Sequence, residues 1–346
     1  MMQRLKLGTL WVTGLMLAGC GGGANTTVLP SSAGTTSSTS TSGSSTQAFV
    51  TPASSVTTPT YTGTSLSIFQ AINTVRQSVG VGLLSQNTNL DTAAQAHATY
   101  LATQSPPAET HTEVSGNTGF YAISPYARAA LAGFTPASAW IDEAIGNAST
   151  CASQLLDTVY HAQELLGDIQ EVGIGLNANW ACVLDVATVA GTASLQLPSS
   201  GAGVPASGGQ QIALGTVAVY PYNNETTVPA AMSAGENPAP PLPSGYSTPG
   251  HPIMVRVHVD SASDVLSVTN FAVSDSSGSP LTGAVLVNSD AVTASTMTVI
   301  ADPNIAPGVV FFVPQSPLAS QTTYTVVFGG ARNGTAVQNT WSFTTQ

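Results

Sequence analysis

Two stretches of small polar residues divide this 346-residue chain into segments that can fold separately. Residues 21–64 and residues 191–210 consist mostly of Gly, Ser, Thr, Ala and Pro. Such stretches bury too little apolar surface to offset the entropy that is lost on ordering. We therefore expect a flexible tether at 21–64, a linker at 191–210, and two folded domains at 65–190 and 211–346.

The first 20 residues have the pattern of an export signal. Arg4 and Lys6 make the start positive, and the apolar run Leu7 to Ala18 that follows is too short to span a bilayer. The run ends in Leu17-Ala18-Gly19-Cys20, which resembles the lipobox of bacterial lipoproteins, in which the cysteine is acylated. We expect a signal peptide at 1–20 and a lipid on Cys20; an ordinary signal peptide with a chance cysteine is the alternative.

The net charge of the mature chain and the residue after Cys20 limit the partners that we expect. Gly21 follows the cysteine where an aspartate would favour the inner membrane, so we expect lipid anchoring to the bacterial outer membrane or cell surface. Removing the signal peptide leaves four basic residues against 17 acidic ones, a net charge of about −13. Nucleic-acid binding needs a basic surface, so we expect no nucleic-acid partner, and the sequence indicates no particular protein partner.

The first domain mixes helical and strand patterns. Ser67 and Gln70 have the spacing of a capping box at the start of a helical pattern. The spacing of apolar residues, with proline and glycine at the ends of segments, predicts helices over 68–79, 91–101, 124–133 and 151–166. It also predicts strands over 172–176 and 180–187.

Beyond residue 210 the pattern is β only. Val255, Val257 and Val259 alternate with polar residues that include Arg256 and His258, which is typical of a strand with one solvent-exposed face. Further strand candidates are 268–274, 297–301, 309–313, 324–328 and 341–344. Their spacing predicts an antiparallel β-sandwich.

The three cysteines can be assigned together. With Cys20 given to the lipid, Cys151 and Cys182 remain as a pair in an oxidising compartment, which predicts a disulfide. A metal site with thiolate ligands is the alternative, but the chain has no Cys-x-x-Cys spacing to support it.

The chemistry of the first domain depends on His111, Glu143 and His161. Imidazole and carboxylate groups together can bind a divalent metal or move protons, so these three are the candidate metal or catalytic residues. They would suffice for a Zn or Mg site, with Glu113 as a spare acid. The alternative is a hydrogen-bonded network that stabilises the fold.

Other polar residues of the chain have simpler interpretations. His97 lies among alanines on a predicted helix and is expected to be a packed, hydrogen-bonded core residue. Asp142 and Glu164 are expected to be solvated charges. His251 lies in a loop between Pro and Gly residues and has no evident partner nearby in the sequence.

Several short motifs occur in a fixed order: Asn73-x-x-Arg76, Ala93-Ala94-Gln95-Ala96-His97-Ala98, His111-Thr112, Arg128-x-x-x-x-Gly133-Phe134, Glu143-Ala144-Ile145-Gly146, Thr158-Val159-Tyr160-His161 and Val172-Gly173-Ile174-Gly175. This set resembles the CAP superfamily, also called SCP-like, which includes cysteine-rich secretory, antigen 5 and pathogenesis-related proteins. The resemblance implies an α-β-α sandwich whose cleft is lined by His111, Glu143 and His161. It also implies that this cleft binds a divalent metal in some members.

The C-terminal domain more loosely resembles bacterial Ig-like modules, through Tyr220-Pro221, Val228-Pro229 and Trp341-Ser342-Phe343-Thr344-Thr345. The expected fold class is therefore α+β, with a CAP-like α-β-α sandwich followed by an all-β Ig-like sandwich. The first functional hypothesis is a cell-envelope protein whose cleft binds a small ligand or a divalent metal, with sterols or fatty acids as the class that the resemblance implies. A metal-dependent hydrolase of an extracellular substrate is the second, and a non-catalytic adhesion or envelope-structure protein is the third.

Overall fold

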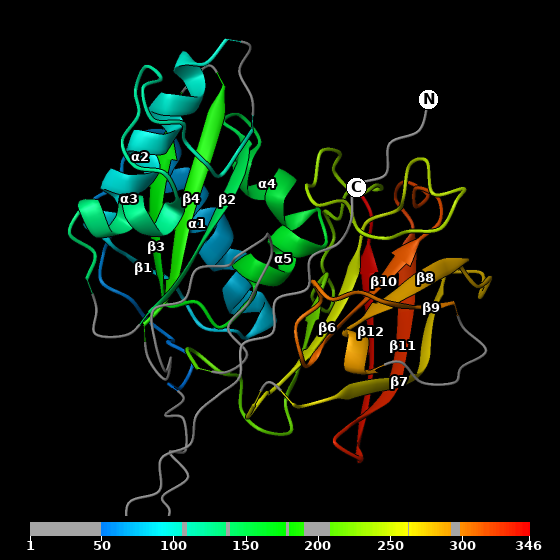
Figure 1. Cartoon of the computed structure of the whole chain (residues 1–346). Coiled ribbons are helices and arrows are strands. Elements are labelled where there is room, and N and C mark those ends of the chain that lie inside the picture. Colours follow the sequence, from blue (N-terminus) through cyan, green and yellow to red (C-terminus); the bar gives the residue numbers. More distant parts are fainter. Residues whose placement is uncertain are drawn as a thin grey trace, which may run out of the picture. The chain divides into compact units, whose positions relative to one another are not determined.

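The computed structural model describes residues 50–105, 109–135, 139–177, 180–189, 208–261, 263–291 and 298–346. The predicted signal peptide, Cys20, most of the tether and most of the linker lie outside these residues. In the described part of the chain, helices and strands alternate up to residue 188, and strands dominate afterwards (Figure 1). None of the helices found there is both long enough and apolar enough to cross a membrane.

The first part of the fold is built from a four-stranded sheet and short helices. The helices are α1 Gly63–Val79, α2 Thr88–Thr103, α3 Pro125–Leu131, α4 Cys151–Leu156 and α5 Tyr160–Leu165. The strands in sheet order are β1 Ser85–Gln86, β3 Glu171–Leu176, β4 Ala181–Thr188 and β2 Trp140–Asn147.

Helices cover both faces of this sheet (Figure 1). Leu184 of β4 packs into the core with α1, α4 and α5, whereas its neighbour Val183 packs with α2. Adjacent strand residues point to opposite faces, so the near-continuous apolar run of β4 reflects a strand buried on both sides. A Cβ on Gly173 would lie 2.1 Å from the backbone of Leu90, which shows how closely α2 packs on β3. The predicted α-β-α sandwich is confirmed.

The helix boundaries differ most from the prediction in two places. Helix α1 begins at Gly63, so Ser67 is not its cap; the Ser67 hydroxyl donates instead to the Gly63 carbonyl. The long helix predicted over 151–166 is broken into α4 and α5 around Thr158 and Val159. Both are β-branched residues with low helix propensity, and the N–H of Val159 is held by a residue far along the chain.

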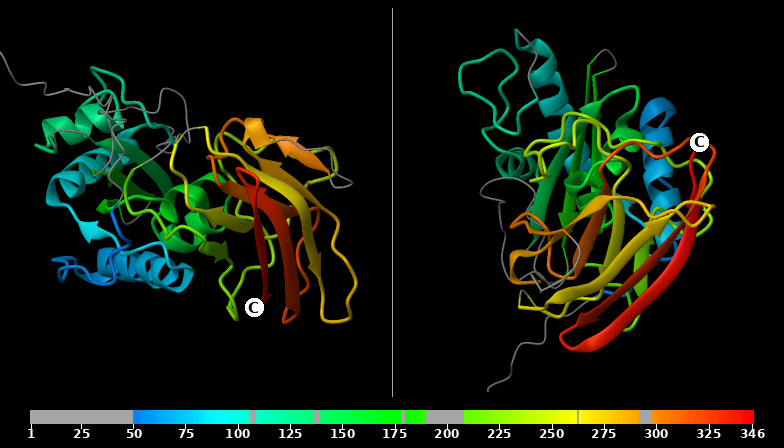
Figure 2. Two further views of the ribbon diagram at one scale, coloured as in Figure 1. Left: turned by 90° about the horizontal axis from the view of Figure 1, so that it is seen from below. Right: turned by 90° about the vertical axis from the view of Figure 1, so that its right-hand side faces the viewer.

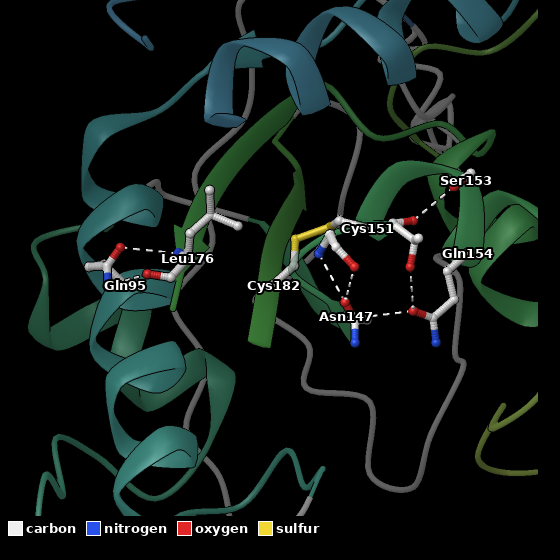
Figure 3. Close-up of a disulfide and its surroundings, with 9 residues drawn as sticks. Gln95, Asn147, Cys151, Ser153, Gln154, Leu176 and Cys182 are labelled. Atoms are coloured by element: carbon white, nitrogen blue, oxygen red, sulfur yellow. Dashed lines mark hydrogen bonds between the residues drawn. A yellow bond between two sulfur atoms is a disulfide. The ribbon is translucent and has the colours of Figure 1, made fainter. Parts of the chain in front are cut away.

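The predicted disulfide between Cys151 and Cys182 is confirmed (Figure 3). The two Cα atoms lie 5.9 Å apart, and the bond joins the first residue of α4 to β4. Beside it, Gln154 accepts a hydrogen bond from the backbone N–H of Asn147, the last residue of β2. These contacts fix α4 against the sheet.

The second part of the fold is the predicted β-sandwich. Its five-stranded sheet has the order β5 Val217–Tyr220, β6 Ile253–Val257, β10 Val309–Pro314, β8 Gly283–Val287 and β9 Val299–Ala301. Its three-stranded sheet has the order β12 Thr335–Thr344, β11 Thr323–Arg332 and β7 Leu266–Ser274, and Figure 2 shows these long strands side by side. Every pair is antiparallel except β8 with β9. The core between the sheets is rich in aromatic rings, including Phe271, Phe328 and Trp341.

Strand β6 is buried along its whole length, so the prediction of a solvent-exposed face was wrong. Arg256 forms an ion pair with Asp168, which precedes β3 in the first part of the fold. Met254 and Phe311 of the five-stranded sheet belong to the same apolar cluster as Leu165 of α5. One face of this sheet therefore packs inside the sandwich and the other packs on the first part of the fold.

Candidate functional site

His111 and Glu143 meet beside the sheet. His111 lies in the loop between α2 and α3, Glu143 lies in the middle of β2, and His111 Nδ1 donates to Glu143 Oε1 at 3.0 Å. The Glu143 side chain is fully buried, whereas 45% of the His111 side chain is exposed. The pair presents one accessible imidazole that a buried carboxylate holds in place.

His97 and Glu113 extend this contact into the core. His97 Nδ1 lies 2.9 Å from Glu113 Oε1, and its Nε2 lies 2.7 Å from a backbone carbonyl and 3.5 Å from Glu143 Oε1. The second oxygen of Glu113 accepts from the backbone N–H groups of Tyr121 and Ala122. The predicted core role of His97 is confirmed, and the predicted spare acid Glu113 orders the loop that carries His111.

Arg128 of α3 places a positive charge at the centre of the network. Its Nη2 donates to Glu143 Oε2 at 2.6 Å and to the carbonyl of His111 at 3.1 Å, and its Nη1 lies 3.7 Å from Glu113 Oε1. The guanidinium and both carboxylates are fully buried. Buried charges are tolerated when they are paired and hydrogen-bonded, as they are here.

These contacts set the protonation of the exposed imidazole. Burial alone would raise the pKa of Glu143, but the Arg128 guanidinium and the two imidazoles outweigh it and hold this pKa well below its usual range. Burial would lower the pKa of His111, but the hydrogen bond to Glu143 and its negative charge outweigh burial and raise that pKa. His111 is thus biased towards a cationic imidazolium, whose Nε2–H is available as a donor.

Asp142 and Glu164 are buried, so the prediction that they are solvated was wrong. Asp142 neighbours Glu143 on β2 and faces the opposite side of the sheet, while Glu164 lies on α5. Burial raises the pKa of Asp142 to about 7. Burial, and then the charge of Asp142, raise the pKa of Glu164 well above its usual range. Local sequence gave no sign that α5 would be enclosed.

Asp185 is a further buried acid, and the sequence reasoning missed it. It lies on β4 directly opposite Glu143 in the strand pairing. Burial and the Glu143 charge raise the pKa of Asp185 well above its usual range. The available signal was a single carboxylate within the apolar run Ala181–Thr188. The site therefore contains a buried carboxyl group that was not among the predicted residues.

His161 takes part in a different set of contacts from His111 and Glu143. Its Nδ1 lies 3.0 Å from the Thr158 hydroxyl and 3.4 Å from Glu236 Oε1. Glu236, which precedes β6, also accepts the backbone N–H of His161. Of the predicted trio, the structure brings His111 and Glu143 into direct contact and directs His161 towards the C-terminal part of the chain.

The residues present do not fit the predicted Zn or Mg site. In the described part of the chain, no group of three or more His, Cys, Asp or Glu side chains is placed to hold a metal ion. Both oxygens of Glu143 accept hydrogen bonds, one from His111 and one from Arg128. A cation placed there would also meet the Arg128 guanidinium, so we derive no metal-dependent step from this arrangement.

Exposed apolar side chains surround His111 in the sequence of its loop. Val114 is 58% exposed and Ile123 is 60% exposed, and Phe120 is also exposed. The backbone N–H of Glu113 donates to the carbonyl of Ile123, which brings the two ends of the loop together. The loop therefore carries both an exposed imidazole and exposed apolar side chains.

Comparison with known proteins identifies the family of the first part of the fold. The model of the CAP family, described as the cysteine-rich secretory protein family, matches residues 69–184. The match includes the segments that carry His97, His111, Arg128 and Glu143. No curated protein matches the chain.

Proposed function

From the premise that residues 69–184 form a CAP domain, we propose that this domain binds a small amphipathic ligand with an anionic head, of the fatty-acid class. The observation that carries the proposal is the exposed His111 imidazole, which Glu143 holds by its Nδ1. This contact leaves Nε2–H to donate to a ligand carboxylate. A charge-assisted hydrogen bond of this kind is stronger than one between neutral groups.

The apolar part of the ligand has a matching surface. Val114, Phe120 and Ile123 are exposed in the same loop as His111 and can lose water on contact with an acyl chain. Each buried methylene contributes roughly 0.8 kcal/mol, so even a short segment of chain adds measurable affinity. A polar head at His111 and an acyl chain along the loop account for both features.

The test is a titration of the full chain with palmitate and with hexadecanol, which lacks the carboxylate. We expect palmitate to bind more tightly, and His111→Ala to weaken it by about tenfold or more, equivalent to about 1.4 kcal/mol. Hexadecanol binding should change little in this variant. Equal palmitate affinity in the wild type and His111→Ala would contradict the proposal and favour an adhesion or structural role.

The apolar contribution has its own matched control. Ile123→Ser should weaken both ligands, because both carry the same acyl chain. Leu214→Ser removes an equally exposed apolar side chain from the segment before β5 and should leave both affinities unchanged. An equal loss in the two variants would show that binding is non-specific.

We also propose that the exported chain is anchored to the bacterial outer membrane or cell surface by a lipid on Cys20. The support is the sequence Leu17-Ala18-Gly19-Cys20 after an apolar run. Metabolic labelling with an alkyne-bearing fatty acid, followed by denaturing washes, should label the wild type and not Cys20→Ser. Label that persists in Cys20→Ser would rule out this anchor.

A further inference from the structure

A cavity of about 650 Å³ lies between the helical part of the fold and the segment after β5. Val75 of α1 and Leu156 of α4 give it an apolar wall. Asp157, Tyr220 and Glu225 place two carboxyl groups and a phenol along it. The described residues that line this cavity include acidic side chains and no lysine, arginine or histidine.

The two carboxyl groups are buried without a matching positive charge. Glu225 accepts the backbone N–H of Tyr222 at 3.1 Å, which satisfies part of one group. His251 Nδ1 lies 3.7 Å from Asp157 Oδ1. That distance is too long for a hydrogen bond. Buried carboxyl groups are normally either paired with a positive charge or neutralised by a proton.

The second observation concerns His251, whose side chain lacks hydrogen-bond partners beside this cavity. Its side chain is fully buried, and within the described residues neither ring nitrogen has a hydrogen-bond partner. Its ring packs edge-on against Tyr220, with 5.5 Å between centroids, and its Nδ1 lies 3.7 Å from Asp157, so it contacts two residues that line the cavity. Buried polar atoms without partners are rare in proteins and point to a missing group. Burial lowers the pKa of His251 to about 3, so a neutral ring cannot supply the counter-charge.

We propose that this cavity binds a small organic cation, with its ammonium group between Asp157 and Glu225 and its apolar part against Val75 and Leu156. The ammonium supplies the charge that the two carboxylates lack and donates the hydrogen bonds that Asp157 does not receive from His251. The ring of Tyr220 adds a surface suited to a cation. None of these residues belongs to the network around His111, so this site is separate from the proposed fatty-acid site.

The pKa values of the two carboxyl groups agree with this assignment. Burial, and then the charge of Glu225, raise the pKa of Asp157 to about 7, and burial raises that of Glu225 to about 7. Without a cation, therefore, protons partly neutralise the two groups near neutral pH. An entering ammonium takes over this role, and binding releases protons to the solvent.

The test compares benzylamine, which is cationic, with benzyl alcohol, its neutral counterpart, by calorimetric titration of the full chain. We expect benzylamine to bind at least tenfold more tightly at pH 7. Titrations in two buffers of different ionisation enthalpy should show proton release on benzylamine binding. Equal binding of the two compounds, or no binding of benzylamine, would overturn the proposal.

The variants assign binding to the cavity. Asp157→Asn with Glu225→Gln keeps the shape of the wall and removes both charges, so the preference for benzylamine should disappear. Glu225→Gln alone should reduce it and serves as the second variant if the double variant does not fold. Glu109→Gln removes one exposed carboxylate elsewhere and should leave the preference intact. A preference that persists in the folded double variant would place the binding outside this cavity.

Discussion

At the scale of single residues, the charge balance of the core depends on Arg128. Its guanidinium lies among Glu143, Glu113 and the carbonyl of His111, all held by the same side chain. The sequence identified Arg128 as part of a motif and His111 and Glu143 as candidates. It did not reveal that Arg128 would neutralise Glu143, because the charges come from separate elements that only the fold brings together.

Arg128→Gln should therefore destabilise the protein strongly. The change leaves two buried carboxylates short of positive charge, and breaking a buried pair on one side typically costs about 3–5 kcal/mol. Urea denaturation would measure the loss. Arg332→Gln is the comparison variant, because one partner of Arg332, Asp260, has a side chain that is 58% exposed, although the other, Asp264, is buried; we expect a smaller loss than for Arg128→Gln. Similar losses in the two variants would show that Arg128 has no special role.

At the scale of elements, the sequence predicted most strands and helices where one face is apolar or where glycine and proline mark the ends. It missed β1, β2, β5 and β8. Strand β2 is buried on both faces, so its sequence does not alternate. The break between α4 and α5 was also missed, because Glu236 accepts the N–H groups of Val159 and Tyr160 from more than 70 residues away. No local pattern could report that contact.

Removing the disulfide tests how α4 is held. The bond closes a loop with a sequence separation of 31 residues, for which chain entropy predicts a loss of roughly 3–4 kcal/mol on removal. Cys151→Ser with Cys182→Ser should lose that amount in urea denaturation, and the wild type should lose a similar amount under a reducing agent. Cys20→Ser should change neither value. A reducing agent that further destabilises the double variant would mean that its effect is not due to this bond.

Glu236→Ala tests the junction between α4 and α5. The variant loses the acceptor for three backbone N–H groups and the contact with His161, so we expect a loss of roughly 1–3 kcal/mol. Hydrogen exchange should become faster at residues 159–161 and in α5. Glu109→Ala, on an exposed acid, is the control and should leave exchange unchanged. Unchanged protection of α5 in Glu236→Ala would show that the contact does not hold the helix.

At the scale of the whole molecule, the two predicted folded parts share contacts that the sequence did not suggest. Gln211 at the start of the C-terminal part is buried and donates to Asp168, which also pairs with Arg256. The low-complexity stretch at 191–210 predicted a linker between independent domains. Composition alone does not indicate which residues on either side of a linker contact one another. The apolar cluster that includes Tyr160 and Phe311 contains side chains from both parts.

This enclosure of acids makes the stability of the whole protein depend on pH. Burial raises the pKa values of Asp142, Asp157 and Glu225 to about 7, whereas the unfolded chain titrates these groups near 4. The folded state therefore binds more protons between those values, so the free energy of unfolding is highest near pH 4 and falls as the pH rises to about 7. Glu143 acts in the opposite sense, because its lowered pKa stabilises the fold above pH 4 and this stabilisation is lost only in stronger acid.

Urea denaturation between pH 4 and pH 8 should accordingly show a decline of several kcal/mol as the pH rises, since each unit of pKa shift corresponds to about 1.4 kcal/mol. The variant with Asp142→Asn, Asp157→Asn and Glu225→Gln should show a flatter profile, because the neutral amides do not titrate. Glu109→Gln should keep the wild-type profile, since Glu109 is exposed. Stability that rises from pH 5 to pH 7.5 in the wild type would show that the enclosed carboxyl groups are charged in the folded state and find counter-charges there.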